Sequence, residues 1–147
     1  ALLIGKAYRA AELGIRFVLD PASELHGDGQ YLPASSLITI LGNLTENAFD
    51  ALRDAPENAQ KEVTVSIREG EHGMLISVDD SGAGIAADKL DRIFERGFST
   101  KGEGRGTGLS LVKDTVDAFH GTIRVESEPG IGSSFIITVA ESANGQQ

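Results

Sequence analysis

Hydrophobic residues recur along the chain at two spacings, which predict helices and strands in a definite order. From Leu37 to Arg53, apolar residues return every three or four positions, the spacing of one helix face. A second helical pattern covers residues 109–119 and is expected to stop at Gly121. Residues 1–12 resemble the end of a further helix. Alternating apolar positions predict strands at 15–20, 63–67, 74–78, 122–126 and 134–139.

This order of elements predicts an α+β fold. Strands joined by short turns favour a largely antiparallel sheet, and helices with one apolar face favour a single helical layer on one side of it. Five glycines between residues 97 and 108 predict a mobile loop. We expect one domain over residues 13–141, preceded at 1–12 by the end of a longer helical region and followed by a frayed tail at 142–147.

Composition narrows the function classes. At 147 residues the chain has the length of one domain, and with 40% apolar but only 5% aromatic residues its core must be aliphatic. The net charge of −9 argues against nucleic acid and against anionic membrane surfaces, because both require a basic protein surface. The absence of cysteine excludes disulfides and thiolate metal sites. No apolar run approaches the ~20 residues that span a bilayer.

A polar stripe on the predicted helix 37–53 is the first candidate site. Its members, spaced three and four apart, are Asn43, Glu46, Asn47 and Asp50. The stripe lies about a third of a turn or more from the apolar one, so it can face a cleft while the other side packs. A carboxamide oxygen suits Mg²⁺ and adds no negative charge beside a phosphate. The alternative interpretation is a solvated helix face.

Two glycine segments are further candidates. Asp80, Gly82 and Gly84 follow a predicted strand, where the carboxylate could accept a hydrogen bond from the adenine amine and the glycines would let the backbone approach the flat base. A plain hairpin turn explains the same residues. The segment Gly104–Leu109 leads into a helix start, whose N–H groups attract anions, with Lys101 and Arg105 adding positive charge. A disordered surface loop is the alternative.

Taken together and in order, these segments resemble the nucleotide-binding boxes of the GHKL ATPases, and most closely those of bacterial two-component sensor histidine kinases. The four boxes correspond to Asn43–Asp50, Asp80–Ile85, Ile93–Thr100 and Gly104–Leu109. The segment Gly121–Ser133 also resembles the kinase pattern, so the similarity covers residues 35–140. It implies the Bergerat fold, a two-layer α/β sandwich with a mixed, mostly antiparallel sheet under helices and a flexible lid over ATP.

The resemblance assigns roles by position. Asn47 would hold Mg²⁺, Asp80 would bind the adenine amine, and Asn43 would lie near the phosphates. Arg96 and Lys101, together with Asn43, are the implied catalytic side chains. The remaining implied nucleotide-binding residues are Asp50, Gly82, Gly84, Ile85, Phe98, Ser99, Thr100, Gly104, Arg105, Gly106, Thr107, Gly108 and Leu109.

Departures from the family pattern refine the expectation. The opening segment 3–15 and the sequence Asn47-Ala48-Phe49-Asp50 resemble the citrate and four-carbon-dicarboxylate sensor group. Many other sensor kinases have a lysine where Asp50 stands, and Arg96 or Lys101 would take over its contact with phosphate. GHKL enzymes that hydrolyse ATP have a glutamate at the place of Asn43, and an amide cannot act as a base.

The implied function is therefore a protein-histidine kinase domain, which positions MgATP for transfer of the γ-phosphoryl group to a histidine on a separate dimerisation hairpin. None of the three histidines, 26, 72 and 120, stands in an acceptor-like sequence. The implied partners are that hairpin and a downstream response regulator. We expect this chain to be a monomeric, cytoplasmic part of a protein anchored in the bacterial inner membrane. The alternatives are a hydrolytic GHKL ATPase, a nucleotide-binding module without phosphotransfer, and an anti-sigma-factor serine kinase.

Overall fold

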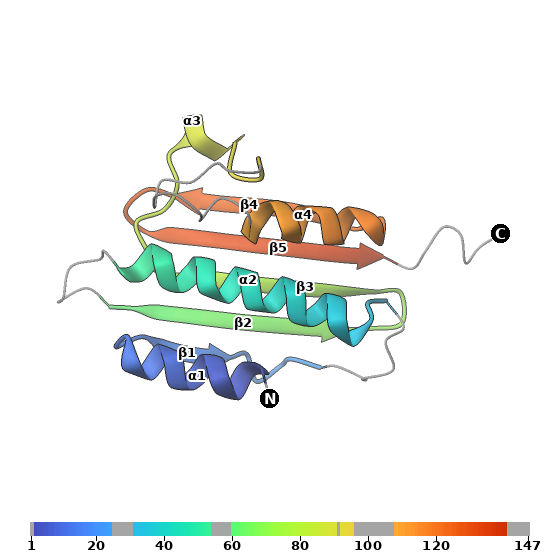
Figure 1. Cartoon of the computed structure of the whole chain (residues 1–147), viewed down its shortest axis with the longest axis horizontal. Coiled ribbons are helices and arrows are strands. Elements are labelled where there is room, and N and C mark those ends of the chain that lie inside the picture. Colours follow the sequence, from blue (N-terminus) through green and yellow to red (C-terminus); the bar gives the residue numbers. More distant parts are fainter. Residues whose placement is uncertain (1, 25–30, 54–59, 91, 96–107, 141–147) are drawn as a thin grey trace.

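Five strands form one open sheet with helices against one face, as seen in the computed structural model of the chain (Figure 1). The structure describes residues 2–24, 31–53, 60–90, 92–95 and 108–140. The strands lie in the order β1-β2-β3-β5-β4. The pair β1–β2 is parallel and the other three pairs are antiparallel. The predicted mixed, mostly antiparallel sheet of an α+β fold is confirmed.

The elements follow the order expected from the hydrophobic pattern. Their bounds are α1 Leu2–Glu12, β1 Arg16–Leu19, α2 Ala34–Arg53, β2 Glu62–Glu69, β3 Gly73–Asp80, α3 Ala87–Leu90, α4 Gly108–Ala118, β4 Thr122–Glu128 and β5 Gly132–Ala140. The short helix α3 was not predicted, because four residues are too few to show a helical period.

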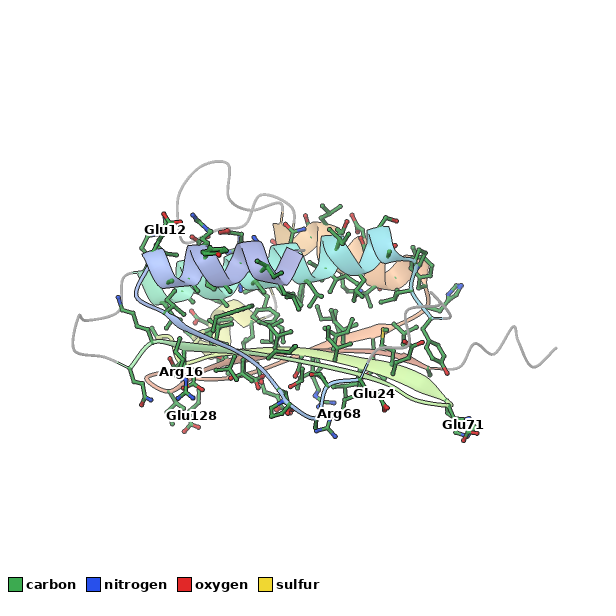
Figure 2. All side chains as sticks on the ribbon, turned by 90° about the horizontal axis from the view of Figure 1, so that it is seen from below. Glu12, Arg16, Glu24, Arg68, Glu71 and Glu128 are labelled. Carbon is green, nitrogen blue, oxygen red and sulfur yellow. The ribbon has the colours of Figure 1, made fainter. Side chains whose placement is uncertain are left out.

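The sheet is covered on one face only, in the described part of the chain. Helix α2 lies between α1 and α4, and all three run over the same side of the strands (Figure 1). Side chains of β2 and β3 are buried at every second position on the helical side. Figure 2 shows Arg16, Arg68 and Glu128 projecting from the opposite side. This single-sided cover explains why the strands alternate in hydrophobicity.

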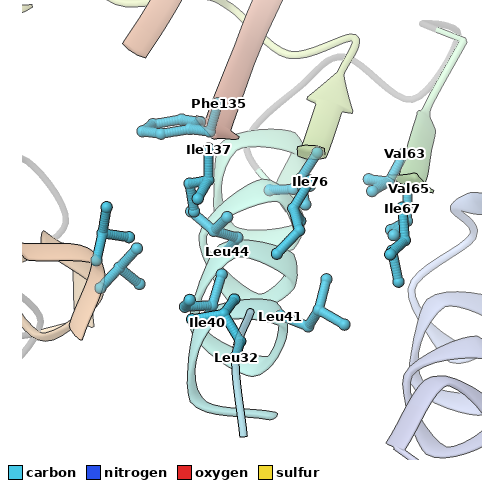
Figure 3. Packing of buried hydrophobic residues seen from close by; sticks show 14 of the residues in the cluster. Leu32, Ile40, Leu41, Leu44, Val63, Val65, Ile67, Ile76, Phe135 and Ile137 are labelled. Carbon is cyan, nitrogen blue, oxygen red and sulfur yellow. The ribbon is translucent and has the colours of Figure 1, made fainter. Parts of the chain in front are cut away.

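Helix α2 is the centre of the core. Ile40, Leu44, Phe49 and Leu52 are fully buried, and Ile40 and Leu44 point toward Ile76 and Ile137 of the sheet (Figure 3). Burying each such side chain contributes about 1.5–3 kcal/mol. The Phe49 ring meets Phe17 of β1 edge to face, with centroids 5.9 Å apart. The apolar face of α2 is thus fixed on the sheet, and this fixes where its polar face points.

Helix α4 ends close to the predicted Gly121, but a different residue adopts the left-handed backbone conformation. The left-handed residue is His120, with φ of 58°, and the Gly121 N–H donates to the Val116 carbonyl over 3.0 Å. Glycine is required at 121 because a Cβ there would lie 2.8 Å from the Thr138 carbonyl oxygen. His72 and His120 are exposed, while His26 lies outside the described residues.

Candidate functional site

Asp80 ends strand β3 on the side of the sheet that faces the helices. Its side chain is nearly buried, at 8% exposure, and its Oδ1 accepts the Gly82 N–H over 2.9 Å. A Cβ on Gly82 would lie 3.0 Å from the Ala51 carbonyl oxygen of α2 and 2.9 Å from Asp80 Oδ1. Only glycine therefore lets this turn fit between the carboxylate and the helix. The turn brings the Asp80 carboxylate to the C-terminal half of α2.

Gly84 attaches the same turn to the hairpin between β4 and β5. Its φ of 82° and a Cβ that would stand 2.5 Å from the Glu128 carbonyl oxygen both require glycine. The Ala83 carbonyl accepts the Gly130 N–H over 2.7 Å, and the Ile85 N–H donates to Ser127 Oγ over 2.6 Å. Because β3 leads on to α3 and not to a paired strand, the interpretation as a plain hairpin turn is wrong.

Asn43 links the middle of α2 to the start of α4. Its Nδ2 donates to the Thr39 carbonyl over 2.8 Å, which fixes the orientation of the carboxamide. Its Oδ1 lies 3.2 Å from the point where a Cβ on Gly108, the first residue of α4, would stand. The first asparagine of the polar stripe and the second glycine segment, separated by 65 positions in the sequence, are therefore in contact range.

Asn47 lies one turn further along α2 and is half-buried. Its carboxamide has no hydrogen-bond partner within the described part of the chain. A half-buried amide that the protein leaves unmatched is suited to an oxygen-preferring ion such as Mg²⁺. The residues present thus fit the ion that the sequence analysis assigned to Asn47.

The polar stripe does not face one cleft as a unit, which corrects the sequence interpretation. Glu46 turns away from α4 and binds Lys6 and Arg9 of α1, while Asp50 pairs with Arg53 at 3.4 Å. A merely solvated helix face is also wrong for Asn43 and Glu46, because each contacts another element. The stripe is divided between the α4 side and the α1 side of the helix.

Burial raises the pKa of Glu46, but hydrogen bonds and charge attraction from Arg9 and Lys6 outweigh it and lower the pKa below its ordinary value. Glu46 is therefore ionised at neutral pH and held by two cations. The pKa of Arg9 is raised, first through its hydrogen bond with Glu46. A carboxylate held in this way is a poor general base.

The start of α4 supplies the remaining described site residues. Leu109 packs against the core, and Ser110 is buried at 5% exposure. The first-turn N–H groups of this 11-residue helix have no partners within the helix, which suits them to an anion. In the phenylalanine box, Ile93 is buried and the Phe94 ring meets Phe135 with centroids 6.4 Å apart.

Several predicted site residues lie outside the described part of the chain, as does most of the predicted mobile loop. They are Arg96, Phe98, Ser99, Thr100, Lys101, Gly104, Arg105, Gly106 and Thr107. One functional contact that sequence reasoning missed is that of Ser127 with the Ile85 N–H. Its signal was a polar residue at an inward-facing position of β4, after Ile123 and Val125.

A hollow of about 360 Å³ lies at the end of the sheet, where β3, β5 and β4 meet. Asp79, Asp80, Glu126 and Glu128 are among the residues that line it, and strand alternation places the carboxylates of Asp79, Glu126 and Glu128 on the face without helices. Three carboxylates would repel phosphate, so this hollow is not a phosphate site. Within the described ranges, no group of three potential metal-binding side chains occurs and no helix could span a membrane.

Comparison with known proteins gives a consistent result. The family model for histidine kinase-, DNA gyrase B- and HSP90-like ATPases matches residues 33–143. The chain is 46% identical over 138 residues to the sensor histidine kinase DcuS of Escherichia coli strain K12, covering 93% of this chain and 25% of that protein. It is 38% identical over 139 residues to the sensor protein CitS of Bacillus subtilis strain 168, covering 95% and 25%. The chain spans about a quarter of the length of these relatives.

Solved structures of histidine kinases share the fold. The nucleotide-free catalytic domain of the histidine kinase ThkA superposes with a TM-score of 0.73 at 23% identity, over 95% of this chain and 88% of that one. Full-length ShkA in complex with AMPPNP gives a TM-score of 0.73 at 28% identity, over 97% of this chain and 30% of that one. The Bergerat-type sandwich expected from the sequence is confirmed by these similarities.

Proposed function

Because the chain belongs to the histidine kinase-, DNA gyrase B- and HSP90-like ATPase family, we propose that it binds MgATP between α2 and the start of α4. The observation that carries the proposal is that α2 meets both glycine segments. Ala51 contacts the Asp80–Gly84 turn, and Asn43 approaches Gly108. The Asp80 carboxylate, the Asn43 and Asn47 carboxamides and the N-terminus of α4 thus lie along one side of α2.

In this proposal each described residue has one task. Asp80 accepts a hydrogen bond from the adenine amine, while Gly82, Gly84 and Ile85 form the backbone against the base. Asn47 supplies an oxygen ligand for Mg²⁺, and Asn43 and the Gly108 N–H lie beside the phosphates. Bound Mg²⁺ would offset the charge of the phosphate oxygens. Asp50, paired with Arg53, lies one turn beyond Asn47, and Leu109 holds the start of α4 against the core.

The reaction that best fits is transfer of the γ-phosphoryl group to a histidine and not hydrolysis. In the transfer, the bond between the γ-phosphorus of ATP and the oxygen that bridges it to the β-phosphorus breaks, and this oxygen leaves with ADP. A bond from an imidazole nitrogen to the γ-phosphorus forms. Positioning and charge stabilisation supply most of the rate enhancement in such transfers. Asn43 cannot accept a proton from water, and Glu46 is held by Lys6 and Arg9.

The acceptor histidine belongs to another part of the parent protein in this proposal. His72 precedes β3, whose eight residues separate it from the Asp80 end by roughly 25 Å at the rise of a strand. His120 lies about 12 residues beyond Gly108 along α4, roughly 18 Å at the rise of a helix. Both described histidines are therefore at the far end from the site.

The finer features of the parent protein are part of the same proposal. The acceptor would be a helical hairpin that also dimerises the parent, α1 would be the junction to it, and a response regulator would receive the phosphoryl group. We place this domain on the cytoplasmic side of a bacterial inner membrane, because the sensor protein CitS and a probable C4-dicarboxylate sensor kinase are among the relatives. The chain alone is proposed to be a monomer.

The test is incubation of the purified chain with radiolabelled ATP and Mg²⁺, with and without a separately made acceptor hairpin of the parent kinase. Label is expected on the hairpin, acid-labile and alkali-stable as phosphohistidine is, and absent from this chain. Rapid phosphate release without the hairpin would support a hydrolytic ATPase instead. Stable label on a serine would support a serine kinase, and binding without transfer would support a nucleotide-binding module.

A further inference from the structure

Helix α1 forms ion pairs with Glu46 of α2, the helix that carries Asn43 and Asn47. Glu46 of α2 is bound by Lys6 Nζ at 3.2 Å and by Arg9 Nε at 2.5 Å, both on α1. The Lys6 side chain is only 15% exposed and Glu46 is 36% exposed, so the contact is partly shielded from water. Ion pairs of this kind are screened less by salt than fully exposed ones.

The apolar contact of α1 with the domain is small. Ala10 is the one fully buried α1 side chain in the described residues, and Leu3 is only half-buried. Ile4 and Tyr8, on the opposite side of the helix, are 65% and 72% exposed. Because alanine buries little area, the contacts of Lys6 and Arg9 with Glu46 add to the small apolar contact that holds α1 in place.

The bound charge lies next to the proposed phosphate and magnesium side chains. Glu46 directly precedes Asn47, and residues three or four apart on a helix have Cβ atoms roughly 5–6 Å apart, which applies to Asn43 and Asp50. That separation is shorter than the Debye length of about 8 Å at physiological salt, so the Glu46 charge is felt at the site. Without its partners, the carboxylate would repel a triphosphate.

Docked α1 offsets this repulsion. Lys6, Arg9 and Arg53 are paired with Glu46 and Asp50, and Glu12 also attracts Arg9, so that these six side chains carry no net charge in a chain with a net charge of −9. Arg9 also attracts Asp50 electrostatically. The cluster is a locally neutral region on an acidic protein, and two of its three cations come from α1.

We infer that α1 is an electrostatic clamp: docked, it neutralises Glu46 and raises the affinity of the adjacent site for a nucleoside triphosphate, and displaced, it lowers that affinity. The inference rests on the proposed nucleotide site. Coupling of this kind is reciprocal, so the bound triphosphate strengthens the docking of α1 by the same factor. A movement of α1 would therefore change how much MgATP the domain holds.

The experiment measures binding of a non-hydrolysable MgATP analogue to four forms of the full chain by calorimetry. They are wild type, Lys6→Met with Arg9→Met, Glu46→Gln, and the triple variant. The double variant leaves Glu46 uncompensated and should bind about fivefold more weakly, at the low end of typical coupling. Glu46→Gln should bind like wild type, and the triple variant should recover wild-type affinity because the repelling charge is gone. Adenosine, which has no phosphates, should bind all four forms equally.

Recovery in the triple variant separates the clamp from a simple tether. If α1 only braces α2, the double and triple variants lose affinity equally, and the inference is wrong. Lys113→Met, which breaks the α4 surface pair with Asp117 at 2.7 Å, is the matched control and should have no effect. Single Lys6→Met keeps the Arg9 contact and should shift affinity in the same direction by less, which covers poor folding of the double variant.

Amide hydrogen exchange supplies the second readout. The analogue should slow exchange across α1 in wild type and much less in Glu46→Gln, where the ion pairs are missing. Binding with unchanged α1 exchange in wild type, or equal affinity of wild type and the double variant, overturns the clamp alone. Absence of any binding to wild type overturns the proposed function itself, so the two failures are distinct.

Discussion

The Oδ1 atom of Asn43 lies 3.2 Å from the place where a Cβ on Gly108 would stand, which joins two segments that are far apart in the sequence. The Asn43 carboxamide cannot easily move away, because its Nδ2 donates to the Thr39 carbonyl over 2.8 Å. A glycine at 108 lets the Asn43 carboxamide lie close to the first residue of α4. The glycine at 108 is therefore expected to matter for binding more than for folding.

Gly108→Ala should weaken MgATP binding with little loss of stability. The added methyl group presses on Asn43 and shifts a phosphate-side group, whereas the first residue of a helix adds little to its stability, so that alanine is tolerated there. Calorimetry and urea unfolding measure the two effects separately. A variant that is destabilised and binds normally would show that the close approach serves packing alone.

Asp80→Asn should lose about 1–3 kcal/mol of ATP binding free energy, because the amide is a weaker acceptor for the adenine amine than the carboxylate is. Asp79→Asn is the matched comparison, since Asp79 is the neighbouring carboxylate on the opposite face of β3 and binds Ser134. Titration calorimetry of both variants should show a loss for Asp80→Asn only. Equal affinity of Asp80→Asn and wild type would remove Asp80 from the site.

Asn47→Ala should weaken nucleotide binding more in the presence of Mg²⁺ than in its absence. The variant loses one oxygen ligand of the ion, while the contacts with adenine remain. The measurement is ATP affinity with Mg²⁺ and with excess chelator, alongside Asn43→Ala, for which no metal dependence is proposed. If Asn47→Ala loses the same amount under both conditions, its role is structural.

The extent to which the sequence predicts the molecule depends on how local each feature is. The helix over Leu37–Arg53 and the paired strands follow from periodicity, because their burial pattern repeats within a few residues. The Asp80–Gly84 turn was also predicted, because the residues that form it are adjacent in the sequence. Its attachment to Ser127 and Glu128 was not, because those contacts cross more than 40 positions.

The polar face of α2 shows more clearly what local sequence cannot predict. Spacing alone placed Asn43, Glu46 and Asn47 on adjoining turns, but it could not say which neighbour each would meet. Lys6 and Arg9 reach Glu46 across about 40 positions, and only the packing of α1 beside α2 brings them together. The left-handed conformation of His120 was not predicted, because the glycine that follows it is the residue type that usually adopts this conformation. Long-range packing, and not local propensity, decides such details.

Acid should remove the contribution of the Glu46 ion pairs to stability. The folded-state pKa of Glu46 lies below its ordinary value of 4.5, so the contribution is complete above about pH 4.5 and is lost as the pH falls through the folded-state pKa. Its size is at most about 1 kcal/mol, because Glu46 is 36% exposed and screened by water.

Urea unfolding of wild type and Glu46→Gln from pH 7 to pH 3 measures this effect. The difference in stability should be constant down to about pH 5 and then shrink. The comparison of variants is needed because the pKa of Asp20 is lowered too, chiefly by the Ala22 N–H and the Ser66 hydroxyl, and titrates in both proteins. A difference that is unchanged at pH 3 would contradict the ion-pair interpretation.

Three glycine-to-alanine changes should separate backbone strain from steric contact. Gly84→Ala meets both, since its φ is 82° and its Cβ would lie 2.5 Å from the Glu128 carbonyl oxygen, so it should destabilise the protein by more than about 1–3 kcal/mol. Gly130→Ala has a φ of 85° but nothing within 4 Å, so only the strain of about 1–2 kcal/mol remains. Gly5→Ala lies inside α1 with open space around it and should stabilise that helix by about 0.5–1 kcal/mol.

Chemical unfolding should rank the three variants in this order of stability, with Gly84→Ala the least stable. Because Gly84 fixes the turn that carries Asp80, Gly84→Ala should also bind ATP more weakly at temperatures where it is still folded. If Gly84→Ala and Gly130→Ala cost the same, the contact with Glu128 does not constrain the turn, and the position of Asp80 must depend on Gly82 and α2 alone.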